Sequence, residues 1–124
     1  MTGEKILIVE DNPLNMELVR DLLEARGYVV LEASTAQEGI EMVHKEMVDL
    51  VSMDVQLPGM DGLTATRLLR QDTNLADLKI VALTAHAMKG DEQKVLEAGC
   101  NGYISKPIDT RQFPVQIAVY LQKA

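Results

Sequence analysis

Short apolar runs alternate with longer amphipathic segments along this chain, and the alternation constrains its fold more than any other feature. Five runs are short enough to be single strands, and most of them are rich in Val, Ile and Leu: residues 6–9, 28–31, 50–53, 80–83 and 102–104. Continuously apolar strands are typical of parallel sheets that helices cover on both faces. We therefore expect an α/β fold, a doubly wound five-stranded parallel sheet with five helices in a three-layer sandwich.

The segment after the first run carries the signals of a helix. Asn12 is a favourable N-cap, Pro13 suits the first helical position, and Gly27 is a natural stop. The apolar residues that recur at helical spacing, and that we expect to face the core, are Leu14, Leu18 and Leu22, backed by Val19 and Leu23.

A second helix is predicted by a capping box made of Thr35 and Glu38. Its expected apolar stripe consists of Ala36, Ile40, Val43 and Met47. Gly39 lies inside this helix and is expected to weaken it slightly.

Three further helices follow the later strands. One is expected from about residue 63 to residue 70, and the next ends at Gly99. The last helix has Phe113, Ile117 and Leu121 at helical spacing. Because Pro114 lacks an N–H group, we expect the first turn of this helix to be distorted or to begin later.

Size and charge limit what the chain can do. With 124 residues, of which 47% are hydrophobic, it is expected to form one domain, residues 1–124, without an output domain. Nineteen acidic against twelve basic residues give a net charge of −7, which argues against binding to nucleic acid or to an anionic membrane. No apolar run could span a bilayer and no signal-peptide pattern is present, so a cytoplasmic protein is expected. The single cysteine, Cys100, excludes an internal disulfide and is expected to be buried.

Polar side chains stand where four of the predicted strands end. They are Glu10 and Asp11, Asp54, Thr84 and Lys106. Because right-handed crossovers bring the carboxyl ends of parallel strands to one edge, we expect these groups to meet there. Three neighbouring carboxylates repel one another, and a hard cation such as Mg²⁺ relieves the repulsion. With a hydroxyl and an amine beside them for a phosphate oxygen, the set predicts a phosphoryl-transfer site with a carboxylate nucleophile.

These five residues, with Pro107 after the lysine, resemble the motif of the response-regulator receiver domain, and the resemblance extends over essentially the whole chain. Residues 8–12 and 87–92 are most similar to stand-alone receivers of cell-cycle and cell-division control. The resemblance implies the CheY-like strand order 2-1-3-4-5. It also implies a bacterial two-component signalling protein rather than an enzyme, with at most self-phosphorylation and self-dephosphorylation.

The same resemblance implies roles at the acidic edge. Asp54 would accept a phosphoryl group from a sensor histidine kinase, a phosphotransfer protein or a small acyl phosphate. Mg²⁺ or Mn²⁺ would be held by Asp11, Asp54 and the backbone carbonyl of Gln56, with Glu10 acting through water. Gln56 and His86 would tune the access of water to the phosphoryl group.

Further roles concern the response to phosphorylation. Thr84 and Lys106 would contact the phosphoryl group, Tyr103 would be the switch aromatic coupled to Thr84, and the bond before Pro107 would be cis. A downstream effector would bind the fourth helix, fifth strand and fifth helix, including Val95. The protein is expected to be a monomer.

Two other functions fit the same fold. A flavodoxin-like nucleotide carrier would need a loop rich in Gly, Ser or Thr after the first strand, where residues 10–13 are Glu, Asp, Asn and Pro. A Mg²⁺-dependent aspartyl-phosphate phosphatase usually has a second acid at the position of Gln56. Taken singly, Asp54 could be a turn former, Thr84 and Lys106 a cap and a surface charge, and Tyr103 a core aromatic. The constellation favours the receiver.

Overall fold

The computed structural model describes residues 3–85 and 89–122, so His86 lies outside the described residues. Five strands form one parallel sheet in the order β2-β1-β3-β4-β5, which confirms the expected order. The strands are β1 (Lys5–Val9), β2 (Val29–Ala33), β3 (Leu50–Asp54), β4 (Lys79–Thr84) and β5 (Gly102–Ser105). The second strand begins one residue later than predicted and continues two residues further.

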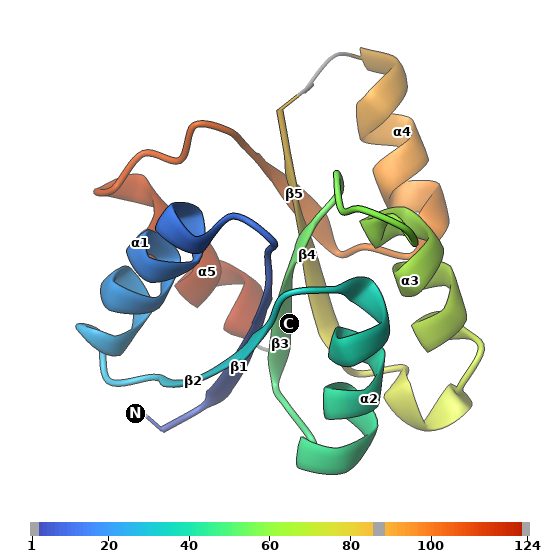
Figure 1. Cartoon of the computed structure of the whole chain (residues 1–124), viewed down its shortest axis with the longest axis horizontal. Coiled ribbons are helices and arrows are strands. Elements are labelled where there is room, and N and C mark those ends of the chain that lie inside the picture. The colour runs from blue at the N-terminus through green and yellow to red at the C-terminus, as the bar shows by residue number, and fades with distance from the viewer. Residues whose placement is uncertain (1–2, 86–88, 123–124) are drawn as a thin grey trace.

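The helices cover both faces of this sheet (Figure 1). They are α1 (Pro13–Glu24), α2 (Ala36–Glu46), α3 (Gly62–Arg70), α4 (Lys89–Ala98) and α5 (Gln112–Leu121), with a short 3₁₀ helix, η1 (Thr73–Leu75), before β4. α1 and α5 pack on one face, and α2, α3 and α4 pack on the other. Each face has its own apolar cluster. Cys100 is buried, as expected, in the cluster under α2, α3 and α4. None of the helices in the described ranges could span a membrane.

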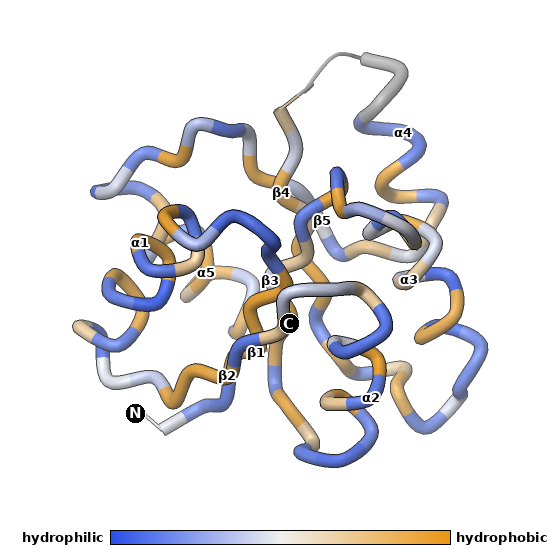
Figure 2. Tube along the Cα trace, viewed as in Figure 1, coloured by the Kyte–Doolittle hydropathy of each residue, from blue (hydrophilic) through white to orange (hydrophobic). Residues whose placement is uncertain are grey.

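Hydropathy follows this layering. In Figure 2 the hydrophobic colour marks the central strands, while hydrophilic residues occupy much of the helices and connecting loops. All five residues of β3 are buried, whereas the edge strand β2 buries only its last residue. The difference arises because helices cover both faces of a central strand, so its side chains are buried on both sides of the sheet.

α1 begins as predicted but turns a different face to the core. The side-chain oxygen of Asn12 accepts hydrogen bonds from the N–H groups of Leu14 and Asn15, at 2.9 and 3.1 Å. The buried residues of the helix are Met16, Val19 and Leu23. Leu14 is 76% exposed and Leu18 is also exposed, so the prediction that they face the core was wrong. Apolar residues occupy so wide an arc of this helix that spacing alone allowed two possible buried faces.

α2 has the predicted cap at its start and an exposed methionine at its end. The Thr35 hydroxyl accepts the N–H of Glu38 at 3.1 Å, and the Glu38 carboxylate accepts the N–H of Ser34 at 2.8 Å. Met47, expected in the buried stripe, is instead the C-cap, with a φ of 55° and 83% exposure. The chain turns into the left-handed region there, which carries the side chain away from the core.

Pro114 lies in the first turn of α5. Asp109 closes a first turn by accepting the N–H groups of Arg111 and Gln112 on its side chain and that of Phe113 on its carbonyl. Pro114 cannot donate the next bond, and the regular helix begins at Gln112. α5 therefore starts before Phe113 and Pro114, so the expectation of a later start was wrong: a proline in the first turn is tolerated because the first N–H groups of a helix have no partner within it.

Candidate functional site

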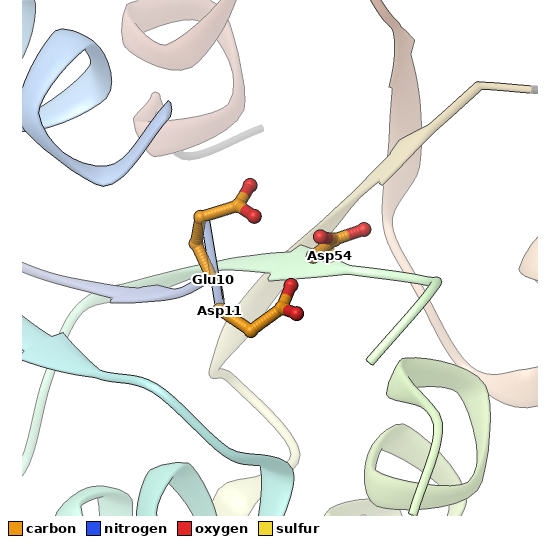
Figure 3. Close-up of side chains that lie close together, drawn as sticks. All are labelled: Glu10, Asp11 and Asp54. Carbon is orange, nitrogen blue, oxygen red and sulfur yellow. The ribbon is translucent and has the colours of Figure 1, made fainter. Parts of the chain in front are cut away.

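The sheet register brings the polar strand ends to one edge. Val9 lies beside Met53, so Glu10 and Asp54 are the next neighbours along the two central strands. Asp54 lies beside Leu83, and Thr84 lies beside Ser105, which precedes Lys106. Figure 3 shows the carboxylates of Glu10 and Asp11, at the end of β1, gathered around that of Asp54, at the end of β3.

Three carboxylates therefore share one place in the fold. Glu10, Asp11 and Asp54 each offer an oxygen, and these oxygens lie within 4.8 Å of one another. Glu10 and Asp54 are each only 2% exposed, whereas Asp11 is exposed. Two of the three carboxylates are therefore shielded from water, and the third, Asp11, is accessible to solvent.

Backbone N–H groups orient the two buried carboxylates. Asp54 Oδ1 accepts the N–H of Gln56 at 3.0 Å, and Glu10 Oε2 accepts the N–H of Asn12 at 3.1 Å. Both are bonds from the second residue after the acid, so each loop folds back on its own carboxylate. The loops after β1 and β3 thus fix the direction of the side chains that they follow.

Lys106 supplies the positive charge of the cluster. Its Nζ lies 3.0 Å from Asp54 Oδ2 and 3.6 Å from Glu10 Oε1. The Lys106–Pro107 peptide bond is cis, as the resemblance implied. Lys106 is mostly buried, so this pairing is screened less than one on the surface.

The single positive charge of Lys106 does not balance the three carboxylates of the cluster. Burial raises the pKa of Glu10, and the neighbouring charge of Asp54 raises it further, against the lowering effects of the Asn12 N–H and of Lys106. Glu10 Oε1 is buried without a hydrogen-bond partner among the described residues. A buried carboxylate oxygen that has an ion pair at 3.6 Å but no hydrogen bond, beside two further carboxylates, fits a hard divalent cation with oxygen ligands, such as Mg²⁺.

The two switch candidates lie on neighbouring strands. Thr84 is buried at the end of β4. Tyr103 on β5 is partly buried against the apolar cluster under α3 and α4, and a hydrogen bond to Glu92 and the charge of that carboxylate raise its pKa. The ring of Tyr103 thus packs on the core, as expected of a core aromatic. Its hydroxyl is near α4, as expected of a residue that signals to that helix.

Sequence reasoning missed the role of Gly62 at the start of α3. A Cβ atom at this position would collide with the carbonyl oxygen of Asp54 and lie 2.9 Å from Met53 Cγ. The Gly62 N–H also donates to Val55 at 3.1 Å. The absence of a side chain lets α3 begin directly against the strand end that carries Asp54.

A groove beside the acidic cluster was missed as well. It has a volume of about 310 Å³ and runs between α1 and the loop after β5. Its lining includes Glu10, Asn15, Leu18, Lys106 and Ile108. Because Leu18 was expected in the core, an exposed apolar wall could not be predicted here. The signal that could have indicated it is the alternative apolar face made of Met16, Val19 and Leu23, which is the face that the helix buries.

Comparison with known proteins agrees with this geometry. The response regulator receiver domain matches residues 6–118. The chain belongs to this family. It is 43% identical over 121 residues to the polar-differentiation response regulator DivK of Brucella ovis, with 98% of both chains covered, and equally similar to DivK of Brucella melitensis.

Solved structures of receivers have the same fold. A putative response regulator from Chloroflexus aurantiacus superimposes with a TM-score of 0.93 at 30% identity, covering 98% of this chain and 100% of that one. The receiver domain of a sensor histidine kinase from Pseudomonas aeruginosa has a TM-score of 0.88 at 33% identity, with 97% and 98% covered. That structure contains a magnesium ion coordinated in its active-site cleft. Receiver domains are signalling modules rather than classical enzymes, they interact with histidine kinases and effectors, and phosphorylation-dependent switching is typical of them.

Proposed function

We propose that this receiver accepts a phosphoryl group on Asp54 and that the modified domain changes its affinity for protein partners. The observation that carries the proposal is the environment of the Asp54 carboxylate. It is buried, held by the Gln56 N–H, and 3.0 Å from the Lys106 ammonium, with two further carboxylates beside it. A nucleophile for phosphoryl transfer needs this kind of fixed orientation and charge neutralisation.

The step proposed at Asp54 is a simple displacement. A carboxylate oxygen attacks the phosphorus of a phosphohistidine or a small acyl phosphate, and an aspartyl phosphate forms. The bond from phosphorus to the donor breaks, and its electron pair leaves with the imidazole nitrogen or the donor carboxylate. Lys106 neutralises a phosphoryl oxygen, and the Thr84 hydroxyl donates a hydrogen bond to another.

We propose that Asp11, Asp54 and the backbone carbonyl of Gln56 hold Mg²⁺, or Mn²⁺, with Glu10 acting through water. When bound, the cation supplies neutralisation of the charge that develops on the phosphoryl oxygens. Two observations support this division: Glu10 is buried and has one oxygen without a hydrogen bond, which a metal-bound water could supply, whereas the Asp11 carboxylate is exposed and open to direct contact with the cation.

Phosphorylation would act on the neighbouring strands. An aspartyl phosphate adds about one negative charge and three acceptor oxygens, which draw Lys106 and Thr84 inward. We propose that Tyr103 follows Thr84 and changes the surface formed by α4, β5 and α5, to which an effector binds. Glu92 on α4 is close enough to Tyr103 on β5 to raise the pKa of its hydroxyl, and this proximity supports the route. Val95 was expected on this surface, but it is buried in the apolar cluster and the expectation was wrong.

The phosphoryl donor would be a sensor histidine kinase or a phosphotransfer protein, and the output would be binding to a protein effector. The receiver itself would be a monomer in the cytoplasm. The groove along Leu18 and Ile108 is also lined by Glu10 and Lys106, both of which adjoin Asp54, and would give a donor room to approach. The likeness to the polar-differentiation regulators supports a role in cell-cycle or cell-division control.

Intact-mass measurement after incubation with a small acyl phosphate and Mg²⁺ tests the assignment. We expect one phosphoryl group on the wild type and none on Asp54→Asn. The matched control is Asp21→Asn, which removes an exposed carboxylate on α1 and should be modified like the wild type. An unmodified wild type, or a modified Asp54→Asn variant, contradicts the proposal.

A further inference from the structure

A second concave site lies at the opposite edge of the sheet from Asp54. It is a cavity of about 630 Å³ at the amino ends of β1, β3 and β4. The end of α2, the 3₁₀ helix η1 and Leu121 at the end of α5 complete its walls. Ligand sites of drug-sized molecules have volumes of roughly 300–1,000 Å³, so the cavity is large enough for a small organic ligand.

The walls of the cavity are of two kinds. Its apolar lining consists of Val43, Met47, Val48, Leu75, Leu78 and Leu121. Its charged lining contains the four acids Glu4, Asp49, Asp72 and Asp77, against the two basic residues His44 and Lys79. The cavity thus combines an aliphatic surface with an excess of negative charge.

Two of the four carboxylates already have partners in the protein. Asp49 accepts the N–H of Lys5 at 2.8 Å. Asp72 accepts the N–H of Asn74 at 2.9 Å and lies 3.3 Å from His44 Nε2. The His44 ring thus faces Asp72, and no ion pair joins it to the other three acids within the described residues.

Glu4 and Asp77 differ from them. Within residues 3–85 and 89–122, neither carboxylate has a hydrogen bond or an ion pair, and one oxygen of Glu4 is buried without a partner. Glu4 is half-buried, and a carboxylate that is partly removed from water and lacks a partner gains from an incoming cation. Asp77 is exposed and adds a second negative charge to the lining.

The exposed end of α2 adds an aliphatic surface to the cavity. Met47 is 83% exposed and belongs to the lining. A methionine side chain adapts to ligands of irregular shape because it is unbranched and polarisable.

We propose that this cavity binds a small organic cation, an ammonium or guanidinium group on an aliphatic stem. The stem would lie along Val43, Leu75 and Leu78, and the cationic group would face Glu4 and Asp77. The excess of acidic groups selects against an anion of the same shape. The site is separate from the phosphoryl site and does not depend on it.

Methyl-detected NMR of the full chain tests the proposal with hexylamine as the probe. We expect saturable shifts of the methyl groups of Val43, Leu75 and Leu78, and none at Val115, which is exposed on α5. 1-Hexanol has the same stem without the charge, and hexanoate has the opposite charge. We expect both to bind about tenfold more weakly at constant ionic strength.

Glu4→Gln should weaken hexylamine binding about threefold and leave 1-hexanol binding unchanged. The matched control, Glu97→Gln on α4, removes the same charge far from the cavity and should have no effect. If Glu4→Gln folds poorly, Asp77→Asn gives the same test at an exposed position. Shifts that do not saturate, equal binding of hexylamine and 1-hexanol, or binding only of a lysine-containing peptide would each overturn the proposal.

Discussion

At the scale of single residues, the acidic cluster is balanced by one amine. Lys106 Nζ contacts both buried carboxylates, Asp54 at 3.0 Å and Glu10 at 3.6 Å. A buried ion pair adds little net stability, but removing one partner leaves an uncompensated charge in a poorly solvated place. The stability of the metal-free domain should therefore depend strongly on this lysine.

Lys106→Met tests that dependence. We expect the free energy of unfolding in EDTA to fall by about 3 kcal/mol, because the charges of Asp54 and Glu10 then lack a counterion. Excess Mg²⁺ should restore part of the loss. Urea unfolding with and without Mg²⁺ measures both effects, and Lys45→Met, at an exposed position on α2, is the matched control. A loss equal to that of the control would show that the pairing contributes nothing.

Glu10 gives a prediction about pH. Burial raises its pKa in the folded state above the ordinary value of 4.5, so ionisation of Glu10 opposes folding. The destabilisation is absent well below pH 4.5 and develops as the pH rises through the folded-state pKa. In EDTA, Glu10→Gln should thus match the wild type at low pH and become relatively more stable at neutral pH.

The same substitution should weaken Mg²⁺ binding by about tenfold or more, as the loss of an outer-sphere carboxylate does in other metal sites. Urea titrations of Glu10→Gln across pH check the effect on stability, and calorimetric Mg²⁺ titration checks the effect on metal affinity. A stability difference that does not change with pH would contradict the burial argument for Glu10.

At the scale of elements, the sequence located the starts of α1 and α2 better than the faces that these helices bury. Asn12 and Thr35 cap their helices as predicted because N-capping is a local interaction within three residues. The face of α1 that packs on the sheet depends on the long-range contact with α5, so Leu14 and Leu18 could not be assigned from spacing alone.

The role of a glycine can also depend on a long-range contact that the local sequence does not reveal. From the sequence alone, Gly39 was expected only to weaken its helix, yet a Cβ atom there would lie 2.8 Å from Val9 Cγ2. Gly39 therefore lets α2 approach β1, a contact between segments thirty residues apart along the chain. The polar strand ends, in contrast, could be predicted to meet, because parallel topology alone brings Glu10, Asp54 and Lys106 to one edge.

Gly62→Ala tests how α3 supports the site. The added methyl group collides with the Asp54 carbonyl, so the helix start or the strand end must shift. We expect destabilisation of about 2 kcal/mol in urea unfolding. Phosphorylation by a small acyl phosphate should also be slower, because the shift displaces Asp54. Thr64→Ala in the same helix is the control, and equal stability and rate in the two variants would contradict this account.

At the scale of the whole molecule, the net charge of −7 is unevenly placed. Three carboxylates meet at the carboxyl edge of the sheet, and four others line the cavity at the amino edge. Repulsion within each group opposes folding, and a cation that binds only the folded state offsets it. The two edges differ in what they can hold, because only the first brings three carboxylate oxygens within 4.8 Å among the described residues.

Mg²⁺ should therefore stabilise the domain through the first edge. At a tenfold excess over its dissociation constant, a ligand specific for the folded state contributes about 1.4 kcal/mol, which for a chain of this size raises Tm by about 5 °C. Thermal unfolding with MgCl₂ should show this shift, whereas NaCl of equal ionic strength should not, because screening does not replace an oxygen-coordinated cation. Asp11→Asn should lose most of the shift, and Asp21→Asn should retain it. Since Asp11 is exposed, its substitution alters the metal site without opening the core, so an unchanged Mg²⁺ shift in Asp11→Asn would place the cation elsewhere on the molecule.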